Sequence, residues 1–318
     1  MKQPSVTVLV TVRNSEKTIG KCIDSILKQN YKNYKIYVTD AFSTDNTFKI
    51  LKKYGKKIQL EQIHGNMSVA YNHMLKKVKS DFVAFTDADA VVDKNWLKLL
   101  TEAFEPHAVT VGGTIKNPTG MKKLPDLIGR ELEYRFSNLP KYVARLPTMN
   151  LCVRTKIAKL ERFDENLNVA QETEWGYRLN KYGKTIFTPK AIVWHYHRAT
   201  WRSYFKQQYT YGLNVPKVYL SKRNRHRISG DEVSNRTMIS EMFLMMLSLF
   251  FLVLGSKWII FAGLSSFLFF ILFLMFTYET HNLSKTVTDF IYYMMIFSVR
   301  TFAWGFGIVM GLLEMMLQ

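Results

Sequence analysis

The chain has 318 residues, of which 47% are hydrophobic and 14% aromatic, and this composition excludes an intrinsically disordered protein. Two cysteines are too few for a disulfide framework. The formal charge of +19 is uneven, because residues 1–238 hold 41 bases and 21 acids, whereas residues 239–318 hold three bases and four acids. A basic N-terminal part suits an anionic partner such as a phosphorylated substrate, an acidic membrane surface or nucleic acid.

Predicted strands and helices alternate along the first two thirds of the chain. The run Val6–Val12 is β-branched and alternating, which is typical of a strand and not of a signal peptide, so we expect the chain to begin in the cytosol. Further strands are predicted over 34–40, 57–63, 81–89, 145–155 and 191–198. Helices are predicted over 14–30, 43–55, 67–79, 95–104, 125–138, 171–184 and 201–213. This order predicts an α/β fold with a mostly parallel sheet and helices on both faces.

Polar residues follow three of the predicted strands. Arg13 and Asn14 follow the first strand, Asp40 ends the second, and Asp87 and Asp89 end the fourth. Ligands of such sheets bind at the carboxyl ends of the strands. Carboxylates suit Mg²⁺ or Mn²⁺, and a divalent cation neutralises a diphosphate leaving group. The pattern favours a metal-assisted nucleotide site over the alternative of two solvated turn aspartates.

The last third of the chain holds three apolar stretches, over residues 238–255, 258–277 and 289–315. A bilayer core needs about 20 apolar residues per helix. We therefore predict a membrane domain over 238–318 with three transmembrane helices; a soluble helical bundle is the alternative. Arg300 lies inside the third stretch, where it either extends to the membrane surface or faces the interior of the bundle.

A basic juxtamembrane segment is predicted over residues 216–237. It contains the sequence KVYLSKRNRHR at 217–227, and Arg236 follows. Because positive charge marks the cytoplasmic side, we expect a multi-pass protein of the cell membrane with its N-terminal domain in the cytoplasm. We also expect this segment to contact anionic lipids. Nucleic acid is not expected as a partner, since three predicted membrane spans argue against it.

Five motifs occur in an order that resembles the family 2 glycosyltransferases, which are inverting enzymes with the GT-A fold. They are VRNSE at 12–16, TDAFSTDNT at 39–47, DADA at 87–90, QETEWGYRL at 171–179 and WHYHR at 194–198. The resemblance covers residues 5–212, and membrane spans commonly follow this domain in the family. It implies a GT-A, Rossmann-like catalytic domain over 1–215, a nucleotide-diphosphate sugar as donor, and Mg²⁺ or Mn²⁺ as cofactor.

The resemblance also implies roles for individual residues on the donor side. Asp40 would accept a hydrogen bond from a ring N–H of the base, and Asp89 would bind the metal directly. The implied nucleotide-binding residues are Thr11, Arg13, Asn14, Asp40, Asn66 and Asp87. The implied metal ligands are Asp89, Asp87 and His195; for His195 a packed histidine is the alternative. The chain departs from the family pattern at Phe42, His64, Asn66 and Gln171.

The catalytic base implied by the resemblance is Glu172, which stands where the family has an aspartate. Glu174 is the competing carboxylate. Its spacing from Arg178 predicts a helix-surface ion pair, which favours Glu172 as the base. The implied acceptor-side residues are Asn150, Glu174 and Trp175.

These features together predict a membrane-bound inverting glycosyltransferase that moves a sugar from a UDP- or GDP-sugar to a hydroxyl group. The membrane helices favour a lipid-linked acceptor or a growing glycan. Alternatives are a polyprenyl-phosphate sugar synthase, which needs no base, and a membrane adaptor with a degenerate nucleotide-sugar site. A sugar-phosphate nucleotidyltransferase is disfavoured, because VRNSEKT at 12–18 lacks the glycines of a phosphate loop.

Overall fold

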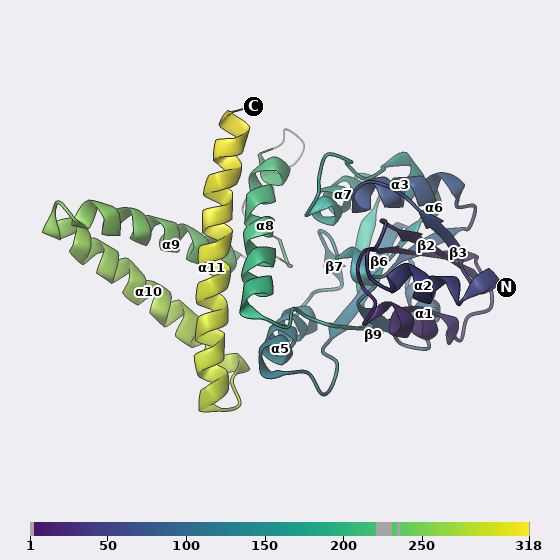
Figure 1. Ribbon diagram of the computed structural model, residues 1–318, viewed down its shortest axis with the longest axis horizontal. Helices are drawn as coiled ribbons and strands as arrows, with labels where there is room; N and C mark the ends of the chain where they lie inside the picture. The colour runs from purple at the N-terminus through teal and green to yellow at the C-terminus, as the bar shows by residue number, and fades with distance from the viewer. Residues whose placement is uncertain (1–2, 221–230, 234–235, 318) are drawn as a thin grey trace. The chain divides into compact units, whose positions relative to one another are not determined.

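A computed structural model describes residues 3–220, 231–233 and 236–317. The chain divides into two compact units, one of residues 1–119 and 135–196 and the other of residues 120–134 and 197–318 (Figure 1). Part of the predicted juxtamembrane segment, residues 221–230 and 234–235, lies outside the described residues, so lipid contact by this segment stays a prediction.

The first unit is built on a sheet whose order among the described residues is β3-β2-β1-β4-β8-β6-β9-β5, with β7 paired to β9. The strands are β1 (Val6–Val12), β2 (Tyr34–Asp40), β3 (Gln59–Gln62), β4 (Phe82–Phe85), β5 (Ala90–Val92), β6 (Ala108–Lys116), β7 (Tyr142–Val143), β8 (Leu151–Arg154) and β9 (Lys184–His195). Strands β3, β2, β1 and β4 are parallel, whereas β8 runs antiparallel to both β4 and β6. The predicted α/β class is confirmed, although the sheet is mixed beyond β4.

Helices cover both faces of this sheet because side chains alternate along its strands. The helices of the first unit are α1 (Ile19–Leu27), α2 (Thr47–Lys52), α3 (Met67–Lys77), α4 (Trp96–Glu102), α6 (Thr155–Leu160) and α7 (Gln171–Leu179), with short 3₁₀ turns η1 (Gly55–Lys57) and η2 (Thr148–Asn150). Val8 and Val10 pack in one core cluster with α1, α2 and α4. On the other face, Tyr71 of α3 contacts the edge of Phe85, and α3 and α7 lie together in Figure 1.

The second unit consists of long helices. They are α8 (Trp201–Tyr219), α9 (Arg236–Gly255), α10 (Ile259–Leu283) and α11 (Val287–Met316), joined by residues 120–134, most of which belong to α5 (Lys123–Ser137). Within the described part of the chain, α9, α10 and α11 are long and apolar enough to cross a membrane, with mean hydropathies of 2.1, 2.6 and 1.6. The three apolar helices predicted from the sequence are therefore present, and α10 extends beyond its predicted end.

Helices α8 and α11 of this unit pack against each other closely, as Figure 1 shows. A Cβ atom on Gly307 would lie 2.4 Å from the carbonyl oxygen of Tyr209, and one on Gly212 would lie 2.2 Å from that of Trp304. Only glycine fits at these two positions, so the contact brings backbone against backbone, as small residues do between membrane helices.

Arg300 faces the interior of the second unit, which settles the choice that the sequence left open. Its guanidinium contacts Glu241 of α9 at 2.9 Å, Glu131 of α5 at 3.2 Å and Glu279 of α10 at 3.6 Å. Arg300 is 6% exposed and Glu241 is fully buried. A second contact holds α5 to α11, since Asp289 pairs with Lys123 and with Arg130. One buried arginine therefore joins four helices.

Removing the positive charge of this cluster should destabilise the second unit. Arg300→Met leaves the buried carboxylate of Glu241 without its partner, at an expected cost of about 3 to 5 kcal/mol. We expect a lower melting temperature for the full chain in detergent, and partial recovery in Arg300→Met/Glu241→Gln, where the most deeply buried of the three carboxylates is neutral.

Glu314→Gln is the matched control, because the pair of Glu314 with Lys217 is exposed. Its loss should cost less than about 1 kcal/mol. Equal melting temperatures for Arg300→Met and Glu314→Gln would contradict a buried, structural role for Arg300.

Candidate functional site

The loops that follow β1 and β2 are tied together at the carboxyl edge of the sheet. Asn14, in the left-handed backbone region at φ 51°, accepts a hydrogen bond from the backbone N–H of Thr44 at 2.8 Å. The backbone N–H of Asn14 donates to the hydroxyl of Ser43 at 2.9 Å. Arg13, the neighbour of Asn14, is exposed at this edge. Asn14 thus shapes the loop that presents Arg13, and contact of either residue with a nucleotide stays a prediction, as it does for half-buried Thr11.

Asp40 ends β2 with a fully buried carboxylate. It accepts hydrogen bonds from the backbone N–H of Ser43 at 3.1 Å and from the side-chain amide of Gln62 at 2.9 Å. The carboxylate therefore fixes the turn after β2 and links it to β3. Hydrogen bonding of Asp40 to a base stays a prediction.

Two of the departures from the family pattern contact each other. Phe42 has φ 50°, a conformation that glycine adopts easily and other residues rarely do. Its ring stacks on the imidazole of His64, with ring centroids 3.7 Å apart and planes 9° apart. The left-handed backbone that glycine would favour is therefore present at Phe42, two residues after Asp40, together with the stacked aromatic pair.

The predicted metal ligands lie together at the same edge. Ligand atoms of Asp87, Asp89 and His195 lie within 4.8 Å of one another, and His195 Nε2 is 3.2 Å from Asp89 Oδ1. The two aspartates lie between β4 and β5, and antiparallel pairing of β5 with β9 sets Ala90 opposite His195. All three side chains are partly buried. Two carboxylates and an imidazole form a donor set that suits Mn²⁺, and carboxylate oxygen also suits Mg²⁺, so these residues fit a divalent cation.

Asn150 holds the strand that carries His195. Strand β6 pairs with β9 through a register shift between Gly113 and Thr114. The side-chain amide of Asn150 bridges this shift by donating to the carbonyls of Thr114 at 2.8 Å and Ala191 at 3.0 Å. A Cβ on Gly113 would lie 1.9 Å from the Ala191 oxygen, so the close approach requires glycine. Asn150 is fully buried, and an acceptor contact by it stays a prediction.

Glu172 lies in the first turn of α7 and is partly buried. Burial raises the pKa of its carboxyl above the usual range, while its own backbone N–H and the charge of Arg145 act in the opposite direction. Burial, and then the charges of Asp87 and Glu172 among others, raise the pKa of Tyr71. The charges of both carboxylates therefore act on one buried tyrosine.

The prediction of a surface ion pair between Glu174 and Arg178 is wrong in its location. The pair forms, with Arg178 Nε 2.7 Å from Glu174 Oε1, but both residues are only 4% exposed. Arg178 also contacts Glu161 and donates to the carbonyl of Arg162. The i,i+4 spacing fixes the partner and does not reveal which face of the helix is buried. Glu174 therefore stabilises the fold, and its acceptor role stays a prediction.

Two further predicted site residues also have structural partners. Trp175 is fully buried and stacks on Phe163 with ring centroids 4.1 Å apart. Asn66 caps α3 by accepting from the backbone N–H of Val69 at 3.0 Å, and its amide donates to the carbonyl of Glu165 at 2.7 Å. Binding of acceptor by Trp175 or of nucleotide by Asn66 stays a prediction.

Sequence reasoning missed two buried residues that interact electrostatically with Glu172, namely Tyr71 and Arg145. Tyr71 lies at an ordinary apolar position of a predicted helix, and Arg145 is the first residue of a predicted strand and belongs to no motif. Both are buried, at 0% and 6% exposure. No local pattern marks them, because their importance comes from the position of α7.

Comparison with known proteins agrees with this geometry. Residues 7–160 match the family described as glycosyl transferase family 2, so the chain carries a domain of that family. A relative from Methanococcus voltae, dolichyl N-acetyl-alpha-D-glucosaminyl phosphate 3-beta-D-2,3-diacetamido-2,3-dideoxy-beta-D-glucuronosyltransferase, is 26% identical over 248 residues, 68% of this chain and 75% of its own length. Two other curated glycosyltransferases are matched over only 14% and 40% of their own lengths.

Two solved structures share the fold. The mannosyltransferase PcManGT from Pyrobaculum calidifontis, in complex with GDP-Man and Mn²⁺, matches 69% of this chain and 64% of its own with a TM-score of 0.55 and 17% identity. S. aureus TarS 1–349 in complex with UDP-GlcNAc matches 99% of this chain and 92% of its own with a TM-score of 0.51 and 15% identity. The first unit is therefore a GT-A fold, as predicted.

Asp89→Asn should weaken binding of Mn²⁺, because the amide keeps the size of the carboxylate and loses its charge. We expect a loss of at least about tenfold, the lower end of what is found even for residues that only orient a ligand. Mn²⁺ affinity can be measured on the full chain by electron paramagnetic resonance, without any substrate.

Asp24→Asn is the control, since Asp24 is an exposed residue of α1 that accepts a hydrogen bond from Tyr54. Its Mn²⁺ affinity should equal that of the wild type. Unchanged affinity in Asp89→Asn, with an intact fold, would mean that these three residues are not a metal site.

Proposed function

We propose that this protein is an inverting, metal-dependent glycosyltransferase that moves a sugar from a nucleotide-diphosphate sugar to a hydroxyl acceptor. One observation carries the proposal: Asp87, Asp89 and His195 meet at the carboxyl edge of a family 2 domain. The charge of Glu172 acts on the same buried tyrosine as that of Asp87, which supports a place for Glu172 in the same site. The edge then holds both a cation site for a diphosphate and a carboxylate for an acceptor.

The donor would lie along the carboxyl ends of β1, β2 and β4. Arg13 and Asn14 present a cationic and an amide group from the loop after β1, and Asp87 and Asp89 lie at the end of β4. A cation bound by Asp87, Asp89 and His195 would supply the positive charge that stabilises a departing nucleoside diphosphate. Both UDP- and GDP-sugars suit this edge, and the two structural relatives are complexes with GDP-Man and UDP-GlcNAc.

Glu172 would act as the general base. The base must take the proton of an acceptor hydroxyl as the oxygen attacks the anomeric carbon from the face opposite the nucleotide. A raised pKa makes the ionised carboxylate a stronger base, which brings it nearer to the value that serves proton transfer at neutral pH. The acceptor oxygen forms the new glycosidic bond, the bond to the diphosphate breaks, and configuration at the sugar inverts.

The acceptor is proposed to be lipid-linked or a growing glycan. The three apolar helices support a multi-pass membrane anchor under this proposal. The basic residues before the first of them support a catalytic unit on the cytoplasmic side. The Methanococcus voltae relative is named for a dolichyl-linked sugar phosphate. A polyprenyl-phosphate acceptor is the second candidate, and it differs in needing no base because its phosphate oxygen is already ionised.

The donor is tested by incubating the full chain, in detergent with Mn²⁺, with a panel of UDP- and GDP-sugars and a membrane lipid extract. We expect release of UDP or GDP together with transfer of labelled sugar to the lipid fraction, and loss of both in Asp89→Asn. Metal-dependent nucleotide binding without release from any donor would support a membrane adaptor and refute the proposal.

Glu172→Gln and Glu174→Gln should fail in different ways. Glu172→Gln is expected to lower kcat on the order of 10²- to 10⁴-fold, with an unchanged melting temperature and donor affinity. Glu174→Gln removes a buried charged hydrogen bond to Arg178 and should cost about 2 kcal/mol of stability.

The pH dependence of the transfer rate tests the same role of Glu172. Glu172 accepts a proton only when ionised, so the wild-type rate should fall as the pH decreases through its raised pKa, above the usual glutamate value of about 4.3. The profile of Glu172→Gln should lack this acid limb. If Glu172→Gln kept full activity toward a hydroxyl acceptor, Glu172 would be excluded as the base. If it kept full activity toward a phosphate acceptor, the result would favour the polyprenyl-phosphate sugar synthase.

A further inference from the structure

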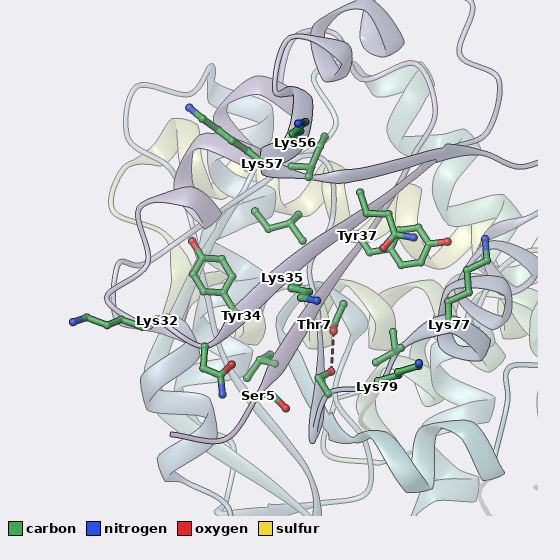
Figure 2. A pocket seen from close by; sticks show the side chains of 17 residues that line it. Ser5, Thr7, Lys32, Tyr34, Lys35, Tyr37, Lys56, Lys57, Lys77 and Lys79 are labelled. Carbon is green, nitrogen blue, oxygen red and sulfur yellow. Dashed lines mark hydrogen bonds between the residues drawn. The ribbon is translucent and has the colours of Figure 1, made fainter. Parts of the chain in front are cut away.

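A second concave surface lies at the amino ends of the parallel strands, opposite the edge that carries the metal ligands. It is a cavity of about 740 Å³, lined by the start of β1, the start of β2, the η1–β3 segment and the end of α3 (Figure 2). Its volume lies within the range of small-molecule sites, which is about 300 to 1,000 Å³. Because β1 has seven residues, the two ends of the sheet are about 20 Å apart.

Lysines dominate the rim of this cavity. Six of its 17 lining residues are lysines and none is acidic; the lysines are Lys32, Lys35, Lys56, Lys57, Lys77 and Lys79. They come from separate segments and surround the cavity from several sides, as Figure 2 shows. Like charges gathered around one concavity repel one another, so an anion that binds there gains attraction from all of them at once.

Only one of these lysines forms an ion pair with an acidic residue in the part of the chain that the structure describes. Lys77 pairs with Glu61 at 2.7 Å. No ion pair within 4.0 Å involves Lys32, Lys35, Lys56, Lys57 or Lys79 in the part of the chain that the structure describes. Lysines without acidic partners suit the binding of an anionic ligand better than a role in a structural ion-pair network.

The floor of the cavity adds hydroxyl groups and an apolar surface. Ser5, Thr7 and Ser80 bring hydroxyl groups, and the hydroxyls of Thr7 and Ser80 lie 2.8 Å apart, joined by the dashed line in Figure 2. Tyr34 and Ile36 bring apolar surface from β2. The hydroxyl of Ser5 donates to the carboxylate of Asp81 and that of Ser80 to the carbonyl of Phe82, so the lysine ammonium groups are the donors that face an anion. Lysine acts on phosphate as a point charge without the fixed geometry of arginine. These residues would therefore select a ligand by its negative charge and not by the orientation of its phosphate groups.

We propose that this cavity is a second binding site, separate from the transfer site, for an anion that carries several phosphate groups. A single phosphate would engage only part of a rim built from four segments, whereas a linear oligophosphate or a phosphate-bearing head group spans it. Such an anion has two sources, a soluble phosphate-rich chain and the head groups of anionic lipids, and the chemistry of recognition is the same for both.

Inorganic tripolyphosphate is the probe for binding. The full chain in phosphatidylcholine nanodiscs is titrated by calorimetry at low ionic strength without divalent cations. The cavity variant is Lys35→Gln/Lys56→Gln/Lys57→Gln/Lys79→Gln. The matched control removes as many exposed lysines elsewhere: Lys94→Gln/Lys156→Gln/Lys159→Gln/Lys190→Gln.

We expect the cavity variant to bind tripolyphosphate at least about tenfold more weakly than the wild type, a difference of about 1.4 kcal/mol. The control variant and Asp89→Asn should bind tripolyphosphate as the wild type does. This result would show that the cavity is separate from the candidate metal site, and it does not depend on whether the proposed function is correct. Added salt should weaken wild-type binding, because exposed charges are screened. An equal loss in the cavity and control variants would reduce the effect to net charge and overturn the proposal.

Lysine footprinting distinguishes the two sources and does not depend on a variant that folds. Trace acetylation followed by mass spectrometry reports the reactivity of each lysine. Protection of the cavity lysines by tripolyphosphate in phosphatidylcholine nanodiscs supports a soluble ligand. Protection in nanodiscs that contain phosphatidylglycerol, with no polyphosphate added, supports lipid head groups. Reactivity of Lys35, Lys56, Lys57 and Lys79 that changes no more than that of Lys156 in both arms would refute the site.

Discussion

The pairing of β5 with β9 is the contact on which the candidate site depends. Asp87 and Asp89 come from the end of β4, while His195 arrives from a strand that enters the sheet much later in the chain, and the register of Ala90 with His195 is what joins them. That register depends in turn on the shift between Gly113 and Thr114, which Asn150 bridges. A buried asparagine thus holds the strand that delivers an imidazole to two carboxylates.

The sequence predicted what is local and missed what is set by distant pairing. Strand β1, strand β2 and the polar residues at their ends follow from alternation within a few residues, and the apolar helices follow from composition alone. The antiparallel pairs of β8 depend on which strands meet, which no local pattern encodes. The same limit explains Glu174: its spacing from Arg178 predicts the ion pair, but only the packing of α7 against the aromatic side chains of Phe85 and Phe163 makes that pair buried.

Departure from a family motif does not by itself indicate loss of the site. A residue other than glycine in the left-handed region costs about 1 to 2 kcal/mol. Phe42 accepts this conformation while its ring stacks on His64, another position where the chain departs from the family pattern, and aromatic pairs contribute about 0.5 to 1.5 kcal/mol beyond their buried area. The two changes are therefore best understood together, as one compensated alteration of the turn after Asp40.

The three carboxylates around Arg300 have a consequence for biosynthesis. Glu131 emerges from the ribosome long before α11. Arg300 can therefore contact all three carboxylates only after α11 has been made and has packed with residues 120–134. A fragment that ends after Tyr196 would expose Leu124 and Leu127 of α5, and a fragment that begins at Arg236 would lack Glu131. Residues 120–134 therefore belong to one packed unit with the C-terminal helices, and a truncated chain that keeps them should also keep those helices.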